Sequence, residues 1–266
     1  MSYQGKVIVV TGASQGIGRA LCRELASQRP KLVLAARERA ALEATAAECT
    51  DRGAQALVVP TDVSDEAACR LLVERTLERF SALDVLVNNA GIGMLARFDE
   101  VTDLRPYELL MRVNYLGSVY PTYHALPHLK SVRGQIVAVS SLAGLNGVPL
   151  RTAYAATKHA QIGFFDSLRV ELRASGVAVT VVCPYFVRSE IRRRSAGADG
   201  RVVAASPVHE DEVMSAEECA RRMARAMARR QRMLVMTFKG RLGRFLKLVA
   251  PELVDRLAEQ AVRRGK

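Results

Sequence analysis

A tyrosine and a lysine stand four residues apart in the segment TAYAATKHAQ (152–161), and their types are suited to proton transfer. On a helix, Tyr154 and Lys158 would share one face, separated by about 6 Å of rise. A free tyrosine has a pKa near 10, so exchanging protons at neutral pH takes about 4 kcal/mol of preference for the phenolate. One ammonium about 4 Å away supplies that order of energy at an effective dielectric constant near 20. The pair is therefore a candidate acid and base, although an isolated Tyr-x-x-x-Lys is more often an exposed polar pair.

A glycine-rich segment, VVTGASQGIGRALCREL, continues directly from the first apolar run. Its G-x-x-x-G-x-G spacing permits a tight turn and a close approach of the backbone to a ligand. A helix beginning at about Gly16 would direct free N–H groups and the positive end of its dipole at a pyrophosphate. The segment therefore predicts a dinucleotide site, lined by Gly12, Ser14, Gln15, Gly16, Ile17 and Gly18.

The end of the second apolar run indicates which dinucleotide is bound. An NAD site usually places a carboxylate there to hold the ribose 2′-hydroxyl. This chain has Ala35 and Ala36 at that place, followed by Arg37. A missing acid and an adjacent guanidinium suit the 2′-phosphate of NADP(H), which a carboxylate would repel. The alternative is that Arg37 is a solvated residue at the start of the next helix.

Alternating strands and helices would have to position these motifs. Seven short runs, most of them continuously apolar, are typical of strands covered on both faces. Helical Ala/Leu/Glu/Arg segments separate the early runs, and strand–helix–strand repetition predicts a parallel sheet with right-handed crossovers. We expect one doubly wound α/β domain over residues 1–238 and a basic helical extension over residues 239–266. The predicted strands are 6–12, 31–36, 54–60, 83–89, 134–141, 177–184 and 232–238.

Composition and charge exclude several classes of protein. Of the 266 residues, 49% are apolar, yet no apolar run approaches the roughly 18 residues of a membrane-spanning helix. The first apolar stretch has only four residues, too few for a signal peptide. Five cysteines without a C-x-x-C spacing fit reduced thiols in a cytoplasmic protein. Of the net charge of +12, residues 221–266 carry +11 (14 Lys/Arg against 3 Asp/Glu), so the body is close to neutral.

Seven motifs together resemble the short-chain dehydrogenase/reductases of the classical type. They occur in the family's order and spacing between about Lys6 and Ile191, some seven-tenths of the chain. Ser141 precedes Tyr154 by thirteen positions, as in the family. The motifs are TGASQGIG (11–18), TDVSD (61–65), NNAG (88–91), VNYLGS (113–118), VSSLAG (139–144), YAATK (154–158) and CPYFVRSE (183–190).

The resemblance implies a role for residues in each motif. Tyr154 would be the acid and base, and Lys158 would tune it; both would also contact the cofactor, Lys158 through the nicotinamide ribose. Ser141 would bind the substrate oxygen, with Ser140 as the alternative that the spacing disfavours. Asn114, in the middle of a helix, would help hold a water molecule that relays protons from Lys158. The other implied contacts are Asp62 and Val63 with the adenine, Asn89, Ala90 and Gly91 with the adenine ribose side, and Pro184, Val187 and Ser189 with the nicotinamide.

Two positions depart from the family pattern. The family commonly has Pro-Gly after the sixth strand, whereas this chain has Pro184-Tyr185. The Tyr185 side chain is expected to reshape the nicotinamide and substrate end, so we include it among the substrate contacts. The threonine that usually contacts the carboxamide is Ser189, which keeps the hydroxyl and loses a methyl group. Neither change removes a catalytic group.

The histidines do not predict a metal site. His124 and His128 have a spacing that can place two ligands on a helix. No acid or cysteine stands nearby as a third ligand, and Pro127 is expected to disturb the turn. We therefore expect surface or oligomer-contact histidines and no metal.

The basic tail predicts two amphipathic helices, the second of them opened by Pro251. Three interpretations stay open. The helices could pack on the body or on a second subunit and shape the substrate entrance. They could touch anionic lipid, as membrane-associating C-terminal segments do in some hydroxysteroid- and retinol-type members of the family. They could bind nucleic acid, which the lack of an aromatic stacking surface disfavours. The apolar positions are Leu242, Phe245, Leu246, Val249, Leu253, Val254, Leu257 and Ala261, and the basic ones Arg241, Arg244 and Lys247.

The sequence thus predicts a Rossmann-type oxidoreductase that uses NADP(H) to interconvert a carbonyl and an alcohol. A pocket built from about 92–98, 142–151 and 185–215, rich in Leu, Val, Met and Phe, favours a lipophilic steroid-, retinoid- or fatty-acyl-like substrate. The alternatives are a 3-oxoacyl reductase acting on carrier-protein thioesters and a non-catalytic, membrane-associated NADP(H)-binding protein. The resemblance implies a homodimer or homotetramer formed through helices near 104–130 and 152–175.

Overall fold

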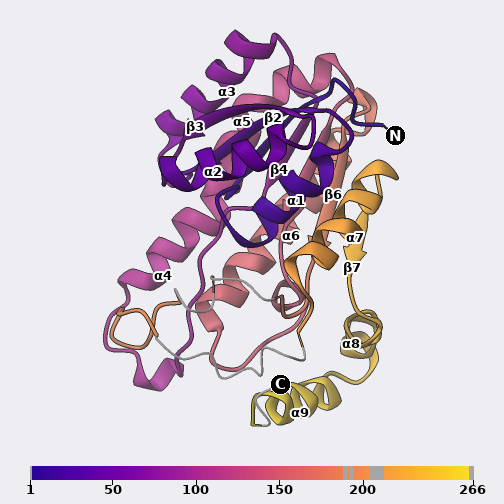
Figure 1. The fold of residues 1–266 in the computed structure, drawn as a ribbon. Helices are drawn as coiled ribbons and strands as arrows, with labels where there is room; N and C mark the ends of the chain where they lie inside the picture. The colour runs from indigo at the N-terminus through magenta and orange to yellow at the C-terminus, as the bar shows by residue number, and fades with distance from the viewer. Residues whose placement is uncertain (1, 188–190, 192–194, 204–212, 264–266) are drawn as a thin grey trace.

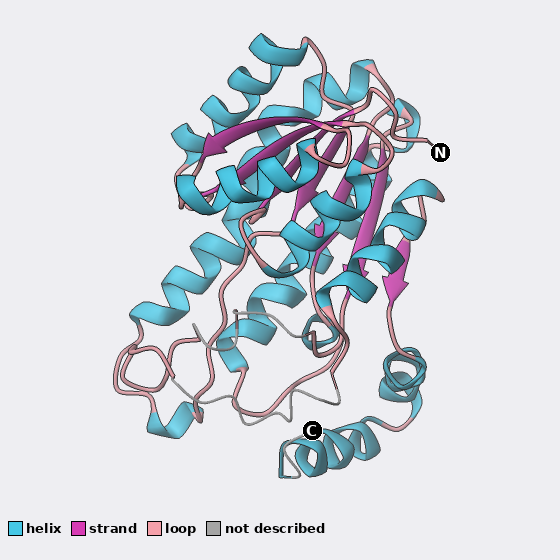
Figure 2. Cartoon of the chain, in the orientation of Figure 1, coloured by secondary structure: helices cyan, strands magenta, loops and turns pink. Residues whose placement is uncertain are grey.

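All seven predicted strands are present in one parallel sheet. The structure, a computed structural model, describes residues 2–187, 191, 195–203 and 213–263. The strands follow the order β3-β2-β1-β4-β5-β6-β7 across the sheet (Figures 1 and 2). This is the predicted Rossmann-type, doubly wound arrangement, whose order reverses between β1 and β4. The strands are β1 (Val7–Thr11), β2 (Lys31–Ala36), β3 (Gln55–Pro60), β4 (Val85–Asn88), β5 (Gln135–Val139), β6 (Ala178–Cys183) and β7 (Met233–Val235).

Helices cover both faces of the sheet. The helices α1, α2 and α7 pack on one face, and α3, α5 and α6 pack on the other. The short α4 continues through η2, a π-helical turn over Met111–Leu116, into α5. The bounds are α1 (Gly16–Ala26), α2 (Arg39–Thr50), α3 (Glu66–Phe80), α4 (Arg105–Leu110), α5 (Gly117–Ser131), α6 (Thr152–Glu171) and α7 (Ala216–Ala228).

Two large apolar clusters lie on opposite faces of the sheet because each central strand is buried on both faces. On β1, Ile8 and Val10 belong to the cluster under α1 and α7, while Val7 and Val9 belong to the cluster under α3, α5 and α6. Alternate side chains of a strand point to opposite faces, so a continuously apolar run supplies both clusters. All five cysteines are buried free thiols.

The helix α5 contains two prolines, and the expected disturbance of the turn at Pro127 does not interrupt it. It runs through Pro121 and Pro127 to Ser131, so Pro127 does not end the helix. The fold also brings an acid to His124, because Glu66 Oε1 on α3 lies 3.5 Å from its Nε2. Among the described residues, no group of three or more His, Cys, Asp or Glu side chains could hold a metal ion.

The tail forms the two predicted helices, α8 (Phe238–Val249) and α9 (Pro251–Arg263), beyond the carboxyl end of β7 (Figure 1). The Thr237 hydroxyl caps α8 by accepting a hydrogen bond from Gly240 N at 3.0 Å. Lys247 Nζ donates to Leu145 O at 3.0 Å, which fastens α8 to the loop after β5. The helix α9 packs against α8. Over the part of the chain that the structure describes, no helix is long and apolar enough to cross a membrane.

Candidate active site

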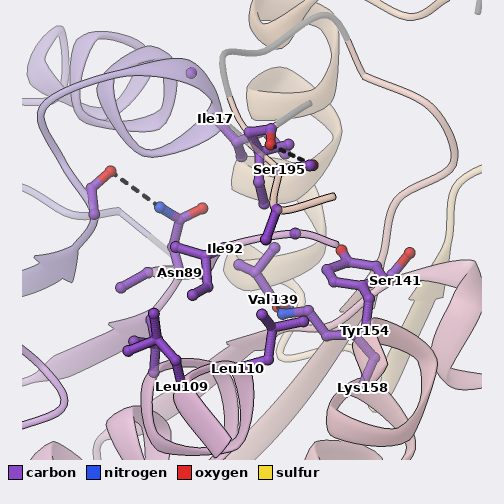
Figure 3. A pocket seen from close by; sticks show the side chains of 18 of the residues that line it. Ile17, Asn89, Ile92, Leu109, Leu110, Val139, Ser141, Tyr154, Lys158 and Ser195 are labelled. Atoms are coloured by element: carbon purple, nitrogen blue, oxygen red, sulfur yellow. Dashed lines mark hydrogen bonds between the residues drawn. The ribbon is translucent and has the colours of Figure 1, made fainter. Parts of the chain in front are cut away.

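One cavity of about 1230 Å³ opens at the carboxyl ends of the strands and gathers most of the predicted site residues (Figure 3). Gly18 and Asn114 lie behind its wall rather than on it, and Ser189 falls outside the described residues. The predicted residues that line the cavity are Gly12, Ser14, Gln15, Gly16, Ile17, Arg37, Asp62, Val63, Asn89, Ala90, Gly91, Ser141, Tyr154, Lys158, Pro184, Tyr185 and Val187.

The loop after β1 has the form of a phosphate cradle. Gly12 and Gly16 have φ angles of +66° and +53°, in a backbone region that residues other than glycine rarely adopt. A Cβ on Gly18 would lie 2.2 Å from Gly12 O, so only glycine lets α1 pack this closely on the loop. The N-cap Gln15 makes no side-chain capping bond, and no acid occupies the first turn of α1. Its first N–H groups are thus left for an anion, which fits a dinucleotide pyrophosphate.

Asn89 fastens this loop to the end of β4. Its Nδ2 donates to Thr11 O at 2.9 Å and to Gly12 O at 3.2 Å. The Thr11 hydroxyl in turn accepts from the backbone N–H groups of Asn89 and Ala90 at 3.0 and 3.1 Å. Asn89 therefore fixes the shape of the cradle in addition to lining the cavity.

Arg37 and Asp62 lie close together at the next part of the wall. Burial tends to raise the pKa of the Asp62 carboxyl, but hydrogen bonds from Ser64 outweigh it and Arg37 adds to them, so the pKa is lowered. The Arg37 side chain is exposed and forms no hydrogen bond or ion pair with another residue in the described ranges. It is therefore free to bind a phosphate group.

Tyr154 and Lys158 share one face of α6, as predicted, and both face the cavity (Figure 3). Lys158 is only 3% exposed, and its Nζ lies 5.7 Å from the centre of the Tyr154 ring. The ammonium donates to Val139 O at 3.0 Å and to Gln161 Oε1 at 2.9 Å. Burial lowers the pKa of Lys158 to about 7, against a smaller opposing influence of Cys183. A lysine that exchanges its proton near neutral pH thus stands beside the phenol.

The sequence analysis missed Gln161, which links Lys158 to the preceding helix. Gln161 is fully buried and donates from Nε2 to Ser118 Oγ at 2.6 Å, and Ser118 Oγ donates to Asn114 O at 3.0 Å. A chain of hydrogen bonds therefore joins the Lys158 ammonium to the Asn114 carbonyl. The sequence feature that could have identified this contact is the position of Gln161 three residues after Lys158, which places both on the same helix face.

The two neighbouring serines have different environments. Ser140 is buried, and its hydroxyl donates to Lys158 O at 3.0 Å, which ties the end of β5 to α6. Ser141 lies beside Tyr154 on the cavity wall, and its Oγ accepts a hydrogen bond from Ala143 N at 3.2 Å (Figure 3). The Ser141 hydroxyl proton stays available to a ligand. The geometry thus agrees with the preference that the spacing gave to Ser141.

Asn114 occupies the π-helical turn η2 rather than a regular helix. Its side chain is fully buried; Nδ2 donates to Ile92 O and to Thr157 Oγ1, both at 3.0 Å. Its Oδ1 accepts from Ile92 N at 2.8 Å. The side chain therefore clamps the loop after β4 to α6, while its predicted part in holding a water molecule stays a prediction. π-Helical turns frequently occur at functional sites.

The far end of the cavity contains a segment that the sequence analysis did not include. Beside residues of the expected ranges, such as Val148 and Phe186, the wall includes Arg105, Leu109 and Leu110 of α4. Which side of a short helix faces a cavity depends on how the helix docks, so periodicity alone could not find them. Tyr185 is 46% exposed, and its ring centre lies 4.6 Å from that of Phe186.

Comparisons with known proteins agree with this geometry. A family model described as short chain dehydrogenase matches residues 6–199. The dehydrogenase/reductase SDR family protein 7-like of Dictyostelium discoideum is 34% identical over 265 residues, covering 97% of this chain and 82% of the relative. The 11-beta-hydroxysteroid dehydrogenase A of Sesamum indicum is 37% identical over 257 residues, covering 94% and 74%.

Two solved structures are also similar. A short-chain dehydrogenase/reductase from Burkholderia phymatum, in complex with NAD, has a TM-score of 0.84 at 28% identity and covers 95% of this chain and 96% of its own. An alcohol dehydrogenase from Thermococcus sibiricus, complexed with 5-hydroxy-NADP, has a TM-score of 0.73 at 26% identity and covers 86% and 93%. Because the two hold different dinucleotides, their similarity does not choose between NAD(H) and NADP(H) for this chain.

Proposed function

The chain belongs to the short-chain dehydrogenase family, an oxidoreductase family, and from that premise we propose that it is an NADP(H)-dependent carbonyl reductase or alcohol dehydrogenase. One observation carries the proposal. Ser141, Tyr154 and Lys158 line the same cavity as the glycine loop after β1 (Figure 3). A dinucleotide extending from that loop would bring its reactive end to these side chains.

The side chains of the site divide the chemistry among them. The nicotinamide, when bound, supplies or accepts the hydride. The Ser141 hydroxyl donates a hydrogen bond to the carbonyl oxygen of the substrate and holds it beside Tyr154. Tyr154 gives its proton to that oxygen as the carbonyl is reduced, and takes a proton from the alcohol in the reverse direction. Lys158 can restore the Tyr154 proton near neutral pH, because burial lowers its own pKa to about 7.

The preference for NADP(H) is supported by Arg37. Its exposed guanidinium stands at the cavity wall beyond β2, between Ala36, which offers no carboxylate to a ribose 2′-hydroxyl at the end of the strand, and the exposed Glu38. A guanidinium binds a phosphate through charge-assisted hydrogen bonds. The apolar side chains of α4 and of the loop after β6 support a lipophilic substrate, and the hydroxysteroid relatives are in keeping with one.

A screen of carbonyl compounds that follows NADPH absorbance tests the proposal. The panel should contain steroid ketones, retinal, medium-chain ketones and aldehydes, and an acetoacetyl thioester. Reduction of a lipophilic ketone or aldehyde is the expected result, and preference for the thioester would instead favour a 3-oxoacyl reductase. Binding of NADPH without reduction of any compound would contradict an enzymatic function.

We also propose that the predicted tail, residues 239–266, contacts an anionic lipid surface. Exposed apolar side chains are gathered on α8, where Phe245, Leu248 and Val249 are 62%, 81% and 65% exposed. On α9, Leu253 and Leu257 are 45% and 51% exposed. The basic side chains Arg241 and Arg244 of α8 complement anionic headgroups, whereas a second copy of this basic tail would repel the first. The homo-oligomer expected through 104–130 and 152–175 would then use a different surface.

Co-sedimentation with phosphatidylserine vesicles tests the tail. Deletion of residues 240–266 should lower the bound fraction, and vesicles of phosphatidylcholine alone should bind less of the full chain. If the full chain and the deletion variant bound the vesicles equally, the tail would instead be assigned to packing on the body or on a second subunit.

A further inference from the structure

Arg151 places a positive charge beside the reacting end of the cavity. It is the N-cap residue of α6, three positions before Tyr154, and it lines the cavity. Its guanidinium carbon lies 5.9 Å from the centre of the Tyr154 ring and 5.8 Å from that of Phe186. Two aromatic faces therefore hold this guanidinium near the tyrosine that carries the reaction.

No acid neutralises the Arg151 guanidinium within the described part of the chain, where it forms no ion pair or side-chain hydrogen bond. Burial lowers the pKa of Arg151, because desolvation disfavours the charged form, and a charge on Tyr154 acts in the opposite direction. A partly buried cation without a carboxylate partner lowers the stability of the folded state unless a ligand supplies the missing charge.

The other cations of the cavity have different surroundings. Arg105 is held by Asp103, to which its Nε donates at 3.0 Å, and Lys158 donates to Gln161 and Val139. Arg37 lies beyond β2, at the part of the cavity that we assign to the adenosine of the cofactor. Arg151 is thus the cation that remains for the substrate among the described residues of the reacting end.

We propose that Arg151 binds a carboxylate of the substrate, so that the physiological substrate is a lipophilic oxo acid or the corresponding hydroxy acid. The rings of Tyr154 and Phe186 contact the guanidinium as cation–π partners, which leaves its N–H groups available for a planar acceptor. A carboxylate accepts two such hydrogen bonds side by side. The carbonyl to be reduced would then lie at Tyr154, a few bonds from the carboxylate. The assignment rests on the proposed function, because it takes Tyr154 as the reacting group.

A series of oxodecanoates that differ in the position of the ketone, each paired with its methyl ester, tests the proposal. NADPH consumption gives kcat/KM for both members of each pair, and the ratio of acid to ester isolates the contribution of the carboxylate. For at least one ketone position the acid should be preferred about 10- to 100-fold, the range expected of a charge-assisted bidentate pair.

Substitutions at Arg151 assign that preference to its side chain. Arg151→Met keeps the length and apolar stem but removes the charge, and should bring the ratio close to one. Arg151→Lys should keep part of the preference, because it retains the charge without the planar fork. Arg97→Met is the matched control: this exposed arginine pairs with Asp99 at 2.8 Å, lies outside the cavity wall, and should leave the ratio unchanged. An acid-to-ester ratio near one in the unsubstituted protein, or a preference that survives Arg151→Met, would overturn the proposal.

A binding measurement separates this proposal from the enzymatic one. Decanoate has no ketone and cannot be reduced, whereas it can still occupy the carboxylate site. It should raise the melting temperature of the NADPH-loaded protein but not of the Arg151→Met variant, and decanol should have no such effect. A decanoate shift that depends on Arg151, without turnover of any ketone, would keep the carboxylate site and reject the oxidoreductase function. The absence of both turnover and shift would reject both.

Discussion

The two ends of the cavity depend on opposite properties. The end formed by the loop after β1 depends on glycines, which have no side chain, whereas the end formed by α6 depends on charged side chains that are wholly or partly buried. A Cβ on Gly12 would lie 2.9 Å from the Cα of Ala90, and one on Gly18 would lie 2.2 Å from Gly12 O. At the other end, Lys158 is 3% exposed and burial lowers its pKa to about 7, while Arg151 lacks an acidic partner among the described residues.

The glycine loop thus contributes to the site through its shape, whereas α6 contributes through charge. Changes at the glycine loop should alter cofactor affinity and packing without changing how the protein responds to pH. Changes at α6 should alter rate and pH dependence, and should affect cofactor affinity only through the expected contacts of Tyr154 and Lys158 with the nicotinamide end. Each of the following experiments perturbs one end of the cavity.

Removal of the Tyr154 hydroxyl should have the largest effect. Tyr154→Phe keeps the ring against Lys158 and Arg151 but removes the proton, so kcat should fall about 10²- to 10⁴-fold, the usual contribution of general acid–base catalysis. NADPH affinity, measured by calorimetry, should stay within about threefold, since the glycine loop is untouched. Reduction of carbonyls by Tyr154→Phe at the unsubstituted rate would place the chemistry elsewhere.

Lys158→Met should change how stability depends on pH. An unfolded lysine has a pKa near 10.4, whereas burial lowers that of Lys158 to about 7, so between these values the unfolded chain binds more protons. Stability of the unsubstituted protein should therefore rise with pH across that window, by a few kcal/mol relative to Lys158→Met.

Denaturant unfolding of the cofactor-free proteins between pH 7 and 9.5 measures this difference. Lys130→Met, at an exposed position near the end of α5, is the control and should follow the unsubstituted curve. Parallel curves for Lys158→Met and the unsubstituted protein would mean that the ammonium is better solvated than its burial indicates.

Gly18→Ala should disturb the opposite end. The added Cβ would lie 2.2 Å from Gly12 O and 2.6 Å from Asn89 Nδ2, so the loop or α1 must move. Overpacking of this kind costs about 1–3 kcal/mol, and displacement of the cradle should also weaken NADPH binding. Gly163→Ala on α6 has no atom within 4 Å of its added Cβ and should stabilise the protein by about 0.5–1 kcal/mol. Equal melting temperatures for the two variants would argue against the tight contact.

Arg37→Ala should give the smallest of these effects. It should weaken NADPH binding about tenfold through loss of a phosphate contact, and leave NADH affinity nearly unchanged. Arg39→Ala, which removes an exposed arginine next to Glu43 on α2, controls for the loss of one positive charge. Equal losses for the two dinucleotides would remove the cofactor assignment.

The sequence alone determined the elements whose signals are local. Seven apolar runs became seven strands, Gly16 began α1, and Pro251 began α9, because burial on both faces, glycine turns and helix starts depend on neighbouring residues. The spacing of Tyr154 and Lys158 likewise sufficed to place both on one face of α6, since that relation is fixed by the helical repeat.

Only the tertiary structure decided what each polar group meets. Gln161 reaches Lys158 and Ser118, Asn114 clamps the loop after β4, and the Arg151 guanidinium lies over the rings of Tyr154 and Phe186. The contacts of Gln161 with Ser118, of Asn114 with Ile92 and of Arg151 with Phe186 join segments that are distant in the chain, and the local sequence pattern of neither partner records them. Periodicity fixes which way a side chain leaves its own helix or strand, whereas its partner is chosen by the packing of the whole sheet and its two helical layers.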